Sequence, residues 1–198
     1  MPKTNELDSL IVKNIADLDA TAKQISLIET RVWNALAEEV EAWAKDHEWL
    51  GEFDEDQIWL APSPWQQDDS ETCAGSFYFG SGPDDTESEA PGEPYFWLSR
   101  YLGQAGGDLC LWFDQKVAKP KVWRPVARSF ADELARGGVY MSDACNFFIR
   151  CSLDPLIVAE GLLNDDLSDA VAPIRSALDI VSSLLPTFQQ ALDRAGSA

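Results

Sequence analysis

The chain has 198 residues, 45% of them hydrophobic, with eight Trp and nine Phe, which is enough to bury one core without disulfides or metals. Its net charge of −19 at pH 7 disfavours unaided binding to a phosphate backbone and favours basic protein partners. No stretch resembles a signal peptide or a membrane span, so we expect a soluble cytoplasmic protein that does not bind membranes.

Residues 4–48 carry a helical pattern, with apolar side chains recurring every three or four positions. Asp19 and Thr21 are competent N-caps and predict a break that leaves a second helix over residues 21–48. We expect the apolar stripe to pack on a sheet. A dimerising coiled coil is the alternative, disfavoured because the spacing is not a strict heptad. The stripe consists of Leu7, Ile11, Ile15, Leu18, Ile25, Ile28, Val32, Leu36, Val40 and Trp43.

The single histidine, His47, falls near the end of this helix. There its usual role is to favour the negative end of the helix dipole. A site that needs two histidines is excluded, and a Ser-His or Cys-His pair would have to use this one.

Runs rich in aromatic and β-branched residues predict strands over residues 57–61, 73–79, 95–102, 109–113 and 147–152. The third and fourth runs flank a turn with Gly103, Gly106 and Gly107, which is the pattern of a long hairpin. Both faces of the run at 109–113 carry apolar side chains. We therefore expect this strand to lie at the centre of the sheet, covered on both sides.

Further helices are predicted after the hairpin. Pro125 is placed to begin a helix that Gly137 and Gly138 end, and Asp154 is placed to cap another that starts at Pro155. A last helical region begins at Asp165 or Asp166, where Pro173 and Pro186 start, kink or divide the helices.

These elements predict an α+β, layered fold. An antiparallel-rich central sheet of about five strands carries a long N-terminal helix and C-terminal helices packed on it. We expect a single domain over residues 1–198, with 4–48 helical, 57–152 forming the sheet plus one helix, and 154–195 helical.

Four cysteines lie without any C-x-x-C pair, so buried reduced thiols are favoured over a zinc site or disulfides. They are Cys73, Cys110, Cys145 and Cys151.

The acidic residues are unevenly spread. Residues 46–99 contain fourteen Asp or Glu and no Lys or Arg, whereas residues 100–150 carry a net +3. We expect part of this acidic stretch, together with two tryptophans beside prolines, to bind a basic partner protein. For the two tryptophans, burial in the core is the favoured alternative. The candidates are Glu52, Asp54, Glu55, Asp56, Trp59, Trp65, Asp68, Asp69 and Glu71. Residues 80–94 have no apolar anchor, which predicts a mobile loop, either a solvated linker or a further partner-binding segment.

A second function follows from the LCLWFDQK stretch, where Asp114 and Lys116 stand two apart at the end of a predicted strand and so share one face. This pair and the order helix, strands, helix, strand resemble the core of the PD-(D/E)XK nuclease superfamily. The resemblance implies Mg²⁺ held by Asp114 and an earlier acid, with Lys116 stabilising the attacking oxygen or the phosphate. The earlier acid is either Asp84, in the literal Pro83-Asp84 dipeptide, or Glu93, at the start of the preceding strand. A structural ion pair between Asp114 and a neighbouring cation is the favoured alternative.

We therefore expect an acidic, non-enzymatic interaction domain that needs no cofactor and binds and neutralises or recruits a basic protein. An immunity protein, an antitoxin-like inhibitor or a nucleic-acid mimic would act in this way. The alternative is a Mg²⁺-dependent nuclease-like enzyme or an inactive relative.

Overall fold

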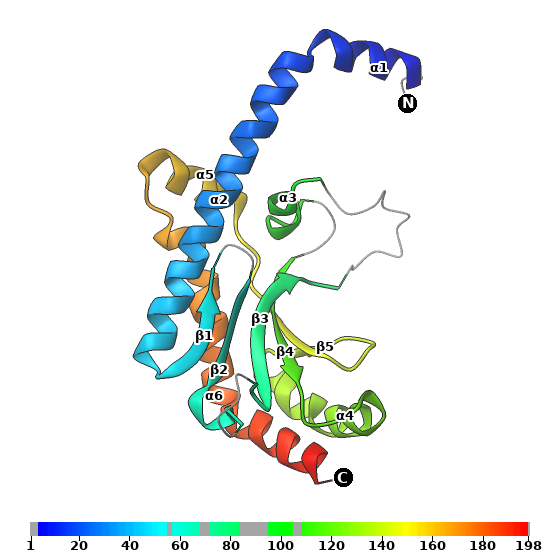
Figure 1. Cartoon of the computed structure of the whole chain (residues 1–198), viewed down its shortest axis with the longest axis vertical. Helices are drawn as coiled ribbons and strands as arrows, with labels where there is room; N and C mark the ends of the chain where they lie inside the picture. The colour runs from blue at the N-terminus through cyan, green and yellow to red at the C-terminus, as the bar shows by residue number, and fades with distance from the viewer. Residues whose placement is uncertain (1–3, 55–56, 68–71, 84–94, 105–107, 198) are drawn as a thin grey trace.

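The computed structural model describes residues 4–54, 57–67, 72–83, 95–104 and 108–197 (Figure 1). The described helices are α1 (Thr4–Lys13), α2 (Ile15–Asp46), α3 (Trp97–Tyr101), α4 (Pro120–Arg136), α5 (Pro155–Asn164), α6 (Ser168–Gly196) and the short 3-10 helix η1 (Ser63–Trp65). The strands are β1 (Trp49–Phe53), β2 (Ile58–Pro62), β3 (Gly75–Ser81), β4 (Leu109–Gln115), β5 (Tyr140–Met141) and β6 (Phe147–Arg150).

The strands form one antiparallel sheet in the order β1-β2-β3-β4-β6-β5. The predicted α+β class, the antiparallel sheet and the packing of N-terminal and C-terminal helices are confirmed. The sheet has six strands, where about five were predicted. The sequence pattern missed β1 and β5, and it predicted a strand over residues 95–102 that does not form. β1 lies between the predicted helix over residues 21–48 and the predicted strand over residues 57–61, and all five of its residues pair with β2.

The predicted central hairpin is wrong. Residues 97–101 form α3 rather than a strand, while β4 pairs with β3 over seven residues and with β6 on its other edge. β4 is therefore central, as expected, but both of its hydrogen-bonding edges are already occupied. The aromatic run folds instead as the short helix α3. In its first turn the backbone N–H of Leu98 donates to Glu29 Oε1 of α2 at 3.1 Å.

Helix boundaries differ from the sequence prediction at two points. The first break lies at Asn14, between α1 and α2, and not at Asp19–Thr21. α4 begins at Pro120, one turn before Pro125, because Pro120 already supplies the preset backbone angle of a first helical residue.

The C-terminal region follows the prediction more closely. The Asp154 carboxylate caps α5 by accepting from the N–H groups of Leu156 and Ile157. α6 then runs as one helix through Pro173 and Pro186.

One face of the sheet is covered by the C-terminal half of α2 together with α4 and α6, and the core lies in this layer (Figure 1). Phe188 of α6 is its hub, since its ring centroid lies 5.2 Å from that of Phe77, 4.7 Å from Phe113 and 6.2 Å from Phe147. All four cysteines are free and buried, as the sequence predicted.

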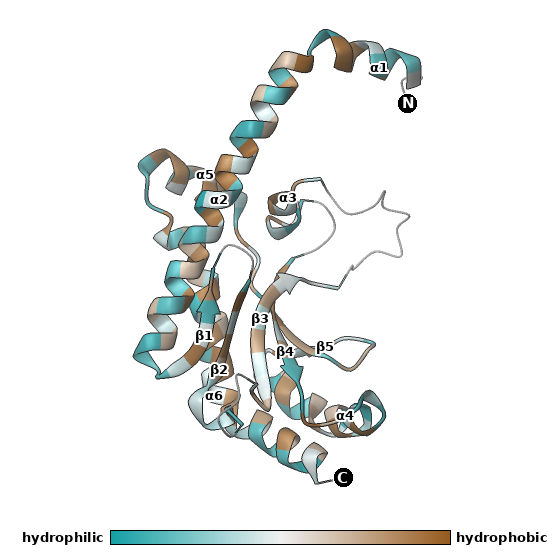
Figure 2. Ribbon diagram, viewed as in Figure 1, coloured by the Kyte–Doolittle hydropathy of each residue, from teal (hydrophilic) through white to brown (hydrophobic). Residues whose placement is uncertain are grey.

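The N-terminal part of the apolar stripe does not pack on the sheet. α1 and the first turns of α2 project from the body, and brown hydrophobic segments alternate with teal hydrophilic ones along their ribbon (Figures 1 and 2). Leu7, Ile11, Ile15 and Leu18 are 38–60% exposed, whereas Val32, Leu36, Val40 and Trp43 are buried. Ile28 is partly buried against the core, so the packing prediction holds from about Ile28 onward. No described helix is long and apolar enough to cross a membrane.

Candidate functional site

The two faces of the sheet differ sharply in burial. Along β3, Phe77 and Phe79 are buried against the helices, while Tyr78 between them is 40% exposed on the opposite face. The same alternation in β4 and β6 buries Leu111 and Ile149 on the helix side. We call the other side the outer face; Tyr78 is exposed on it, whereas Cys110 and Phe148 on the same side are buried, so this face is only partly open to solvent.

Aromatic side chains cross the outer face in register. Trp59 pairs with Tyr78, Tyr78 with Trp112, Trp112 with Phe148, and Phe148 with Tyr140. Directly paired residues on one face lie side by side, so these five residues form a continuous line over five strands, named here the aromatic row.

Contacts along the aromatic row fix its rings. The Trp112 and Phe148 centroids are 4.8 Å apart, and those of Phe148 and Tyr140 are 5.6 Å apart. The Arg150 guanidinium lies about 6 Å from both Phe148 and Tyr140, within cation–π range. Tyr78 and Tyr140 are 40% and 54% exposed and present aromatic surface to solvent, whereas Phe148, between them in the row, is only 4% exposed.

An acidic residue continues the row onto the edge strand, because Glu52 of β1 pairs with Trp59 of β2. Glu52 Oε2 accepts from the Trp59 indole N–H at 3.0 Å and from the Gln57 amide at 2.7 Å. Asp54 Oδ1 accepts from the Gln57 backbone N–H at 2.9 Å, which shapes the turn after β1. The structure thus brings together Glu52, Asp54 and Trp59, three of the predicted partner-binding residues.

The remaining predicted partner-binding residues are not part of this arrangement. Trp65 is 3% exposed and its indole N–H donates to Gln189 of α6, so it belongs to the core and not to an exposed patch. η1 turns its ring inward beneath Phe77 and Phe113. Glu55, Asp56, Asp68, Asp69 and Glu71 lie outside the described residues.

Asp114 and Lys116, the pair of the nuclease resemblance, lie at the end of β4 and form an ion pair with each other. Asp114 pairs with Ser76 on the outer face and lies near Tyr78. Burial, together with the negative charge of Asp114, raises the pKa of the Tyr78 phenol, while Lys116 opposes this shift.

The other half of the metal site that this resemblance implies, Asp84 or Glu93, lies outside the described residues, as does the part of the predicted 80–94 loop from residue 84 onward. Gly80 and Ser81, at the start of that loop prediction, belong to β3. Within the described ranges no three His, Cys, Asp or Glu side chains gather as metal ligands would.

The histidine lies apart from the outer face, whereas Cys110, two residues before Trp112 on β4, points to this face and is fully buried there. His47 is the C-cap residue of α2, as expected, and its ring stacks on Trp43 with centroids 3.9 Å apart. Burial raises the pKa of Cys151 well above its usual range, and the neighbouring Cys110 adds to this shift. The raised pKa suppresses the nucleophilic thiolate.

Of the aromatic row, sequence reasoning selected only Trp59 and missed Tyr78, Trp112, Phe148 and Tyr140. A signal for Tyr78 was present in the alternation of SFYFG, where a polar-tipped aromatic stands between two phenylalanines. No comparable signal links residues 59, 78, 112, 148 and 140, because their alignment depends on the register of five strands. Comparison of the chain with models of protein families, with curated proteins and with solved structures finds no match in any of the three.

Proposed function

We propose that this protein is a non-enzymatic interaction domain that binds a basic partner protein through the outer face of its sheet. The observation that carries the proposal is the fixed Glu52 carboxylate at the end of the aromatic row. Two neutral donors, Gln57 and Trp59, orient this carboxylate without neutralising its charge. An exposed carboxylate held on a paired strand is prepared to meet a cation at little entropic cost.

The aromatic row supplies the second element of such a surface. Aromatic residues are enriched in the cores of protein interfaces, and a guanidinium stacks favourably on their rings. Within the protein itself, Arg150 already lies over Phe148 and Tyr140 in this way. Arginine side chains of a partner would find the same chemistry at Tyr78, which stands two strands from Glu52 of β1.

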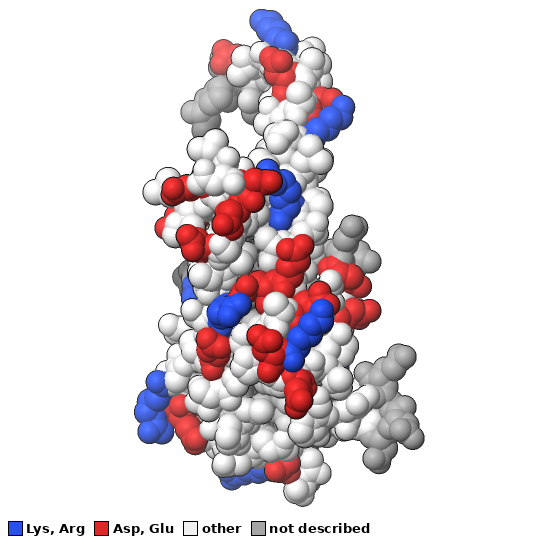
Figure 3. All heavy atoms as spheres, turned by 90° about the vertical axis from the view of Figure 1, so that its left-hand side faces the viewer, with Lys and Arg blue, Asp and Glu red and all other residues white. Residues whose placement is uncertain are grey.

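Long-range charge supports the same conclusion. Figure 3 shows acidic side chains over much of the face formed by α2, α5 and α6. Three cations there are held in ion pairs within the protein: Arg31 with Asp165, Lys45 with Glu41, and Arg175 with Glu39. With a net charge of −19, the molecule attracts basic proteins from a distance and repels nucleic acid.

The test is capture of partners on the immobilised protein, followed by binding of each purified partner. We expect a captured protein to be basic, to bind in a salt-sensitive way, and to bind more weakly to a Trp59→Leu or Tyr78→Ala variant. Tyr140→Ala, at the far end of the row, maps how far the contact extends. Salt-insensitive binding that both of the first two variants retain would contradict the proposal.

The alternative function, a nuclease related to the PD-(D/E)XK superfamily, is favoured by one observation. Asp114 and Lys116 do share one face at the end of a central strand, where a metal ligand and a phosphate-directed ammonium would stand. Their mutual ion pair is equally the contact expected of a structural role. Metal-dependent cleavage decides between the two, as described below.

A further inference from the structure

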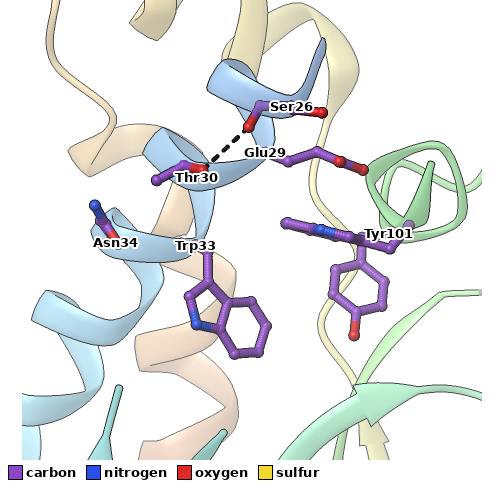
Figure 4. Close-up of a pocket in the computed structure, with 7 residues that line it drawn as sticks. Ser26, Glu29, Thr30, Trp33, Asn34 and Tyr101 are labelled. Atoms are coloured by element: carbon purple, nitrogen blue, oxygen red, sulfur yellow. Dashed lines mark hydrogen bonds between the residues drawn. The ribbon is translucent and has the colours of Figure 1, made fainter. Parts of the chain in front are cut away.

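A cleft of about 520 Å³ separates α2 from α3, away from the outer face (Figure 4). Its volume falls within the ~300–1,000 Å³ typical of small-ligand sites. The cleft is lined by Ser26, Glu29, Thr30, Trp33, Asn34, Trp97 and Tyr101, and none of these is a cation.

Three aromatic rings form its walls. Trp33 and Trp97 meet nearly at right angles, with centroids 5.8 Å apart and planes inclined by 75°. Trp97 and Tyr101 are 4.8 Å apart and inclined by 57°. The Trp33 indole N–H donates to the Asp54 carbonyl at 2.8 Å, which fixes this ring against the β1–β2 turn. A cation that lies over the face of a tryptophan or tyrosine ring is attracted by it, so aromatic walls favour a cationic guest.

The polar groups of the cleft are mainly acceptors. The hydroxyls of Ser26 and Thr30 donate to helix carbonyls, those of Ala22 and Ser26, so their oxygens keep free lone pairs. Glu29 reaches from α2 toward α3, where Oε1 accepts from the Leu98 N–H at 3.1 Å (Figure 4). That single contact leaves the carboxylate with its charge and further acceptor capacity.

Arg31 of α2 and Arg100 of α3 are directed elsewhere. Arg31 pairs with Asp165 at 2.7 Å, and the Arg100 guanidinium donates to the Gly82 carbonyl at 3.3 Å. A negative, acceptor-rich cleft with aromatic walls therefore has no described cation of its own among its lining residues.

We infer that this cleft binds an organic cation that carries N–H groups, a guanidinium or a primary ammonium. The aromatic walls take its charge and its alkyl stem, while Glu29, Ser26 and Thr30 accept its hydrogen bonds. The site is separate from the outer face, so the inference stands whether or not that face binds a protein. The same group occurs on an arginine or lysine of a peptide and in free small amines and guanidines.

Four small probes separate charge from shape and peptide from free cation. They are the N-acetyl amides of arginine and of glutamine, methylguanidinium, and n-butylammonium. Binding is followed from the indole N–H signals of Trp33 and Trp97 in ¹H–¹⁵N spectra. We expect saturable shifts with the cationic probes and none with the glutamine amide. If the arginine amide binds more tightly than methylguanidinium, the site is assigned to a peptide side chain. If methylguanidinium binds more tightly, the site is assigned to a free cation.

Glu29→Gln is the decisive variant, since Gln can still accept from the Leu98 N–H and so preserves α3. Loss of one charged acceptor should weaken the cationic probes about tenfold, at the lower end of what a charge-assisted hydrogen bond contributes because the cleft is open to water. Glu38→Gln is the matched control. Glu38 is exposed nine residues further along α2, about 180° around the helix, and its replacement changes net charge equally.

Trp97→Leu tests the aromatic walls, with circular dichroism to verify that the fold persists, and should weaken the cationic probes as well. The inference is overturned if no cationic probe gives a saturable shift or if the glutamine amide binds as well as the arginine amide. It is also overturned if Glu38→Gln weakens binding as much as Glu29→Gln does.

Discussion

Replacing Glu52 by Gln and Asp54 by Asn removes two negative charges from the β1–β2 hairpin and leaves its geometry in place. Each amide oxygen can accept the hydrogen bonds that the carboxylates now accept from Gln57 and Trp59. The free energy of unfolding should therefore change by no more than about 0.5 kcal/mol, as for other exposed substitutions. The rate of association with the captured basic partner should fall instead.

The size of this fall follows from Coulomb's law. At a distance of about 7 Å in water, each charge contributes about 0.6 kcal/mol, which screening at 0.1 M salt halves to about 0.3 kcal/mol. Two charges then give about 0.6 kcal/mol, or about a threefold slower association. At 0.01 M salt the same reasoning gives about fivefold, because the Debye length grows to about 30 Å.

The control is the pair of substitutions Asp132→Asn and Asp143→Asn. Both residues are exposed, and they lie on α4 and on the β5–β6 turn, at the sheet edge opposite β1. Six strands spaced about 4.8 Å apart separate the two edges by about 24 Å. Two charges at that distance change the rate by only about 1.3-fold even at 0.01 M salt.

Stopped-flow association rates at both salt concentrations measure the effect. Equal slowing by the two double variants would mean that only total charge matters. Unchanged rates for the Glu52 and Asp54 variant would refute the placement of the partner at this hairpin.

Three further predictions concern the outer face and the core. With Mg²⁺ or Mn²⁺ the purified protein should not cut DNA or RNA; cleavage abolished by both Asp114→Ala and Lys116→Ala, with the fold intact, would establish the nuclease instead. The Tyr78 phenol should titrate above its usual pKa of 10.0, mainly through burial, and Asp114→Asn should move its pKa downward in an ultraviolet absorbance titration. Because folding raises this pKa, its contribution to stability is complete below pH 10 and is lost as the pH rises through the folded-state value; stability that increases there would contradict the assignment. Phe188→Ala should reduce the free energy of unfolding by about 3–5 kcal/mol in urea titrations, since it opens a cavity among three phenylalanines, and a loss below about 1 kcal/mol would show that the core collapses around the gap.

The local signals in the sequence were sufficient for several elements. Runs rich in aromatic and apolar residues around Phe77 and Leu111 predicted two of the central strands, and Asp154 before Pro155 predicted a helix start that the structure confirms. These features depend on local composition and on capping, which act over a few neighbouring residues. Acidic Glu52 and Asp54 and aromatic Trp59 were likewise recognisable as candidates from composition alone.

Tertiary contacts decided the rest. Residues 97–101 have the composition of a strand, yet form a helix, because β3 and β6 occupy both edges of β4 and Glu29 accepts from the turn. The aromatic row and the α2–α3 cleft join residues that are far apart in the chain, so no local pattern could specify them. Strand register determines which aromatic side chains become neighbours on a sheet, and helix packing determines which acid stands beside which ring. Register and packing are set only when the whole core assembles, and they place the carboxylates of this acidic chain next to its exposed aromatic surfaces.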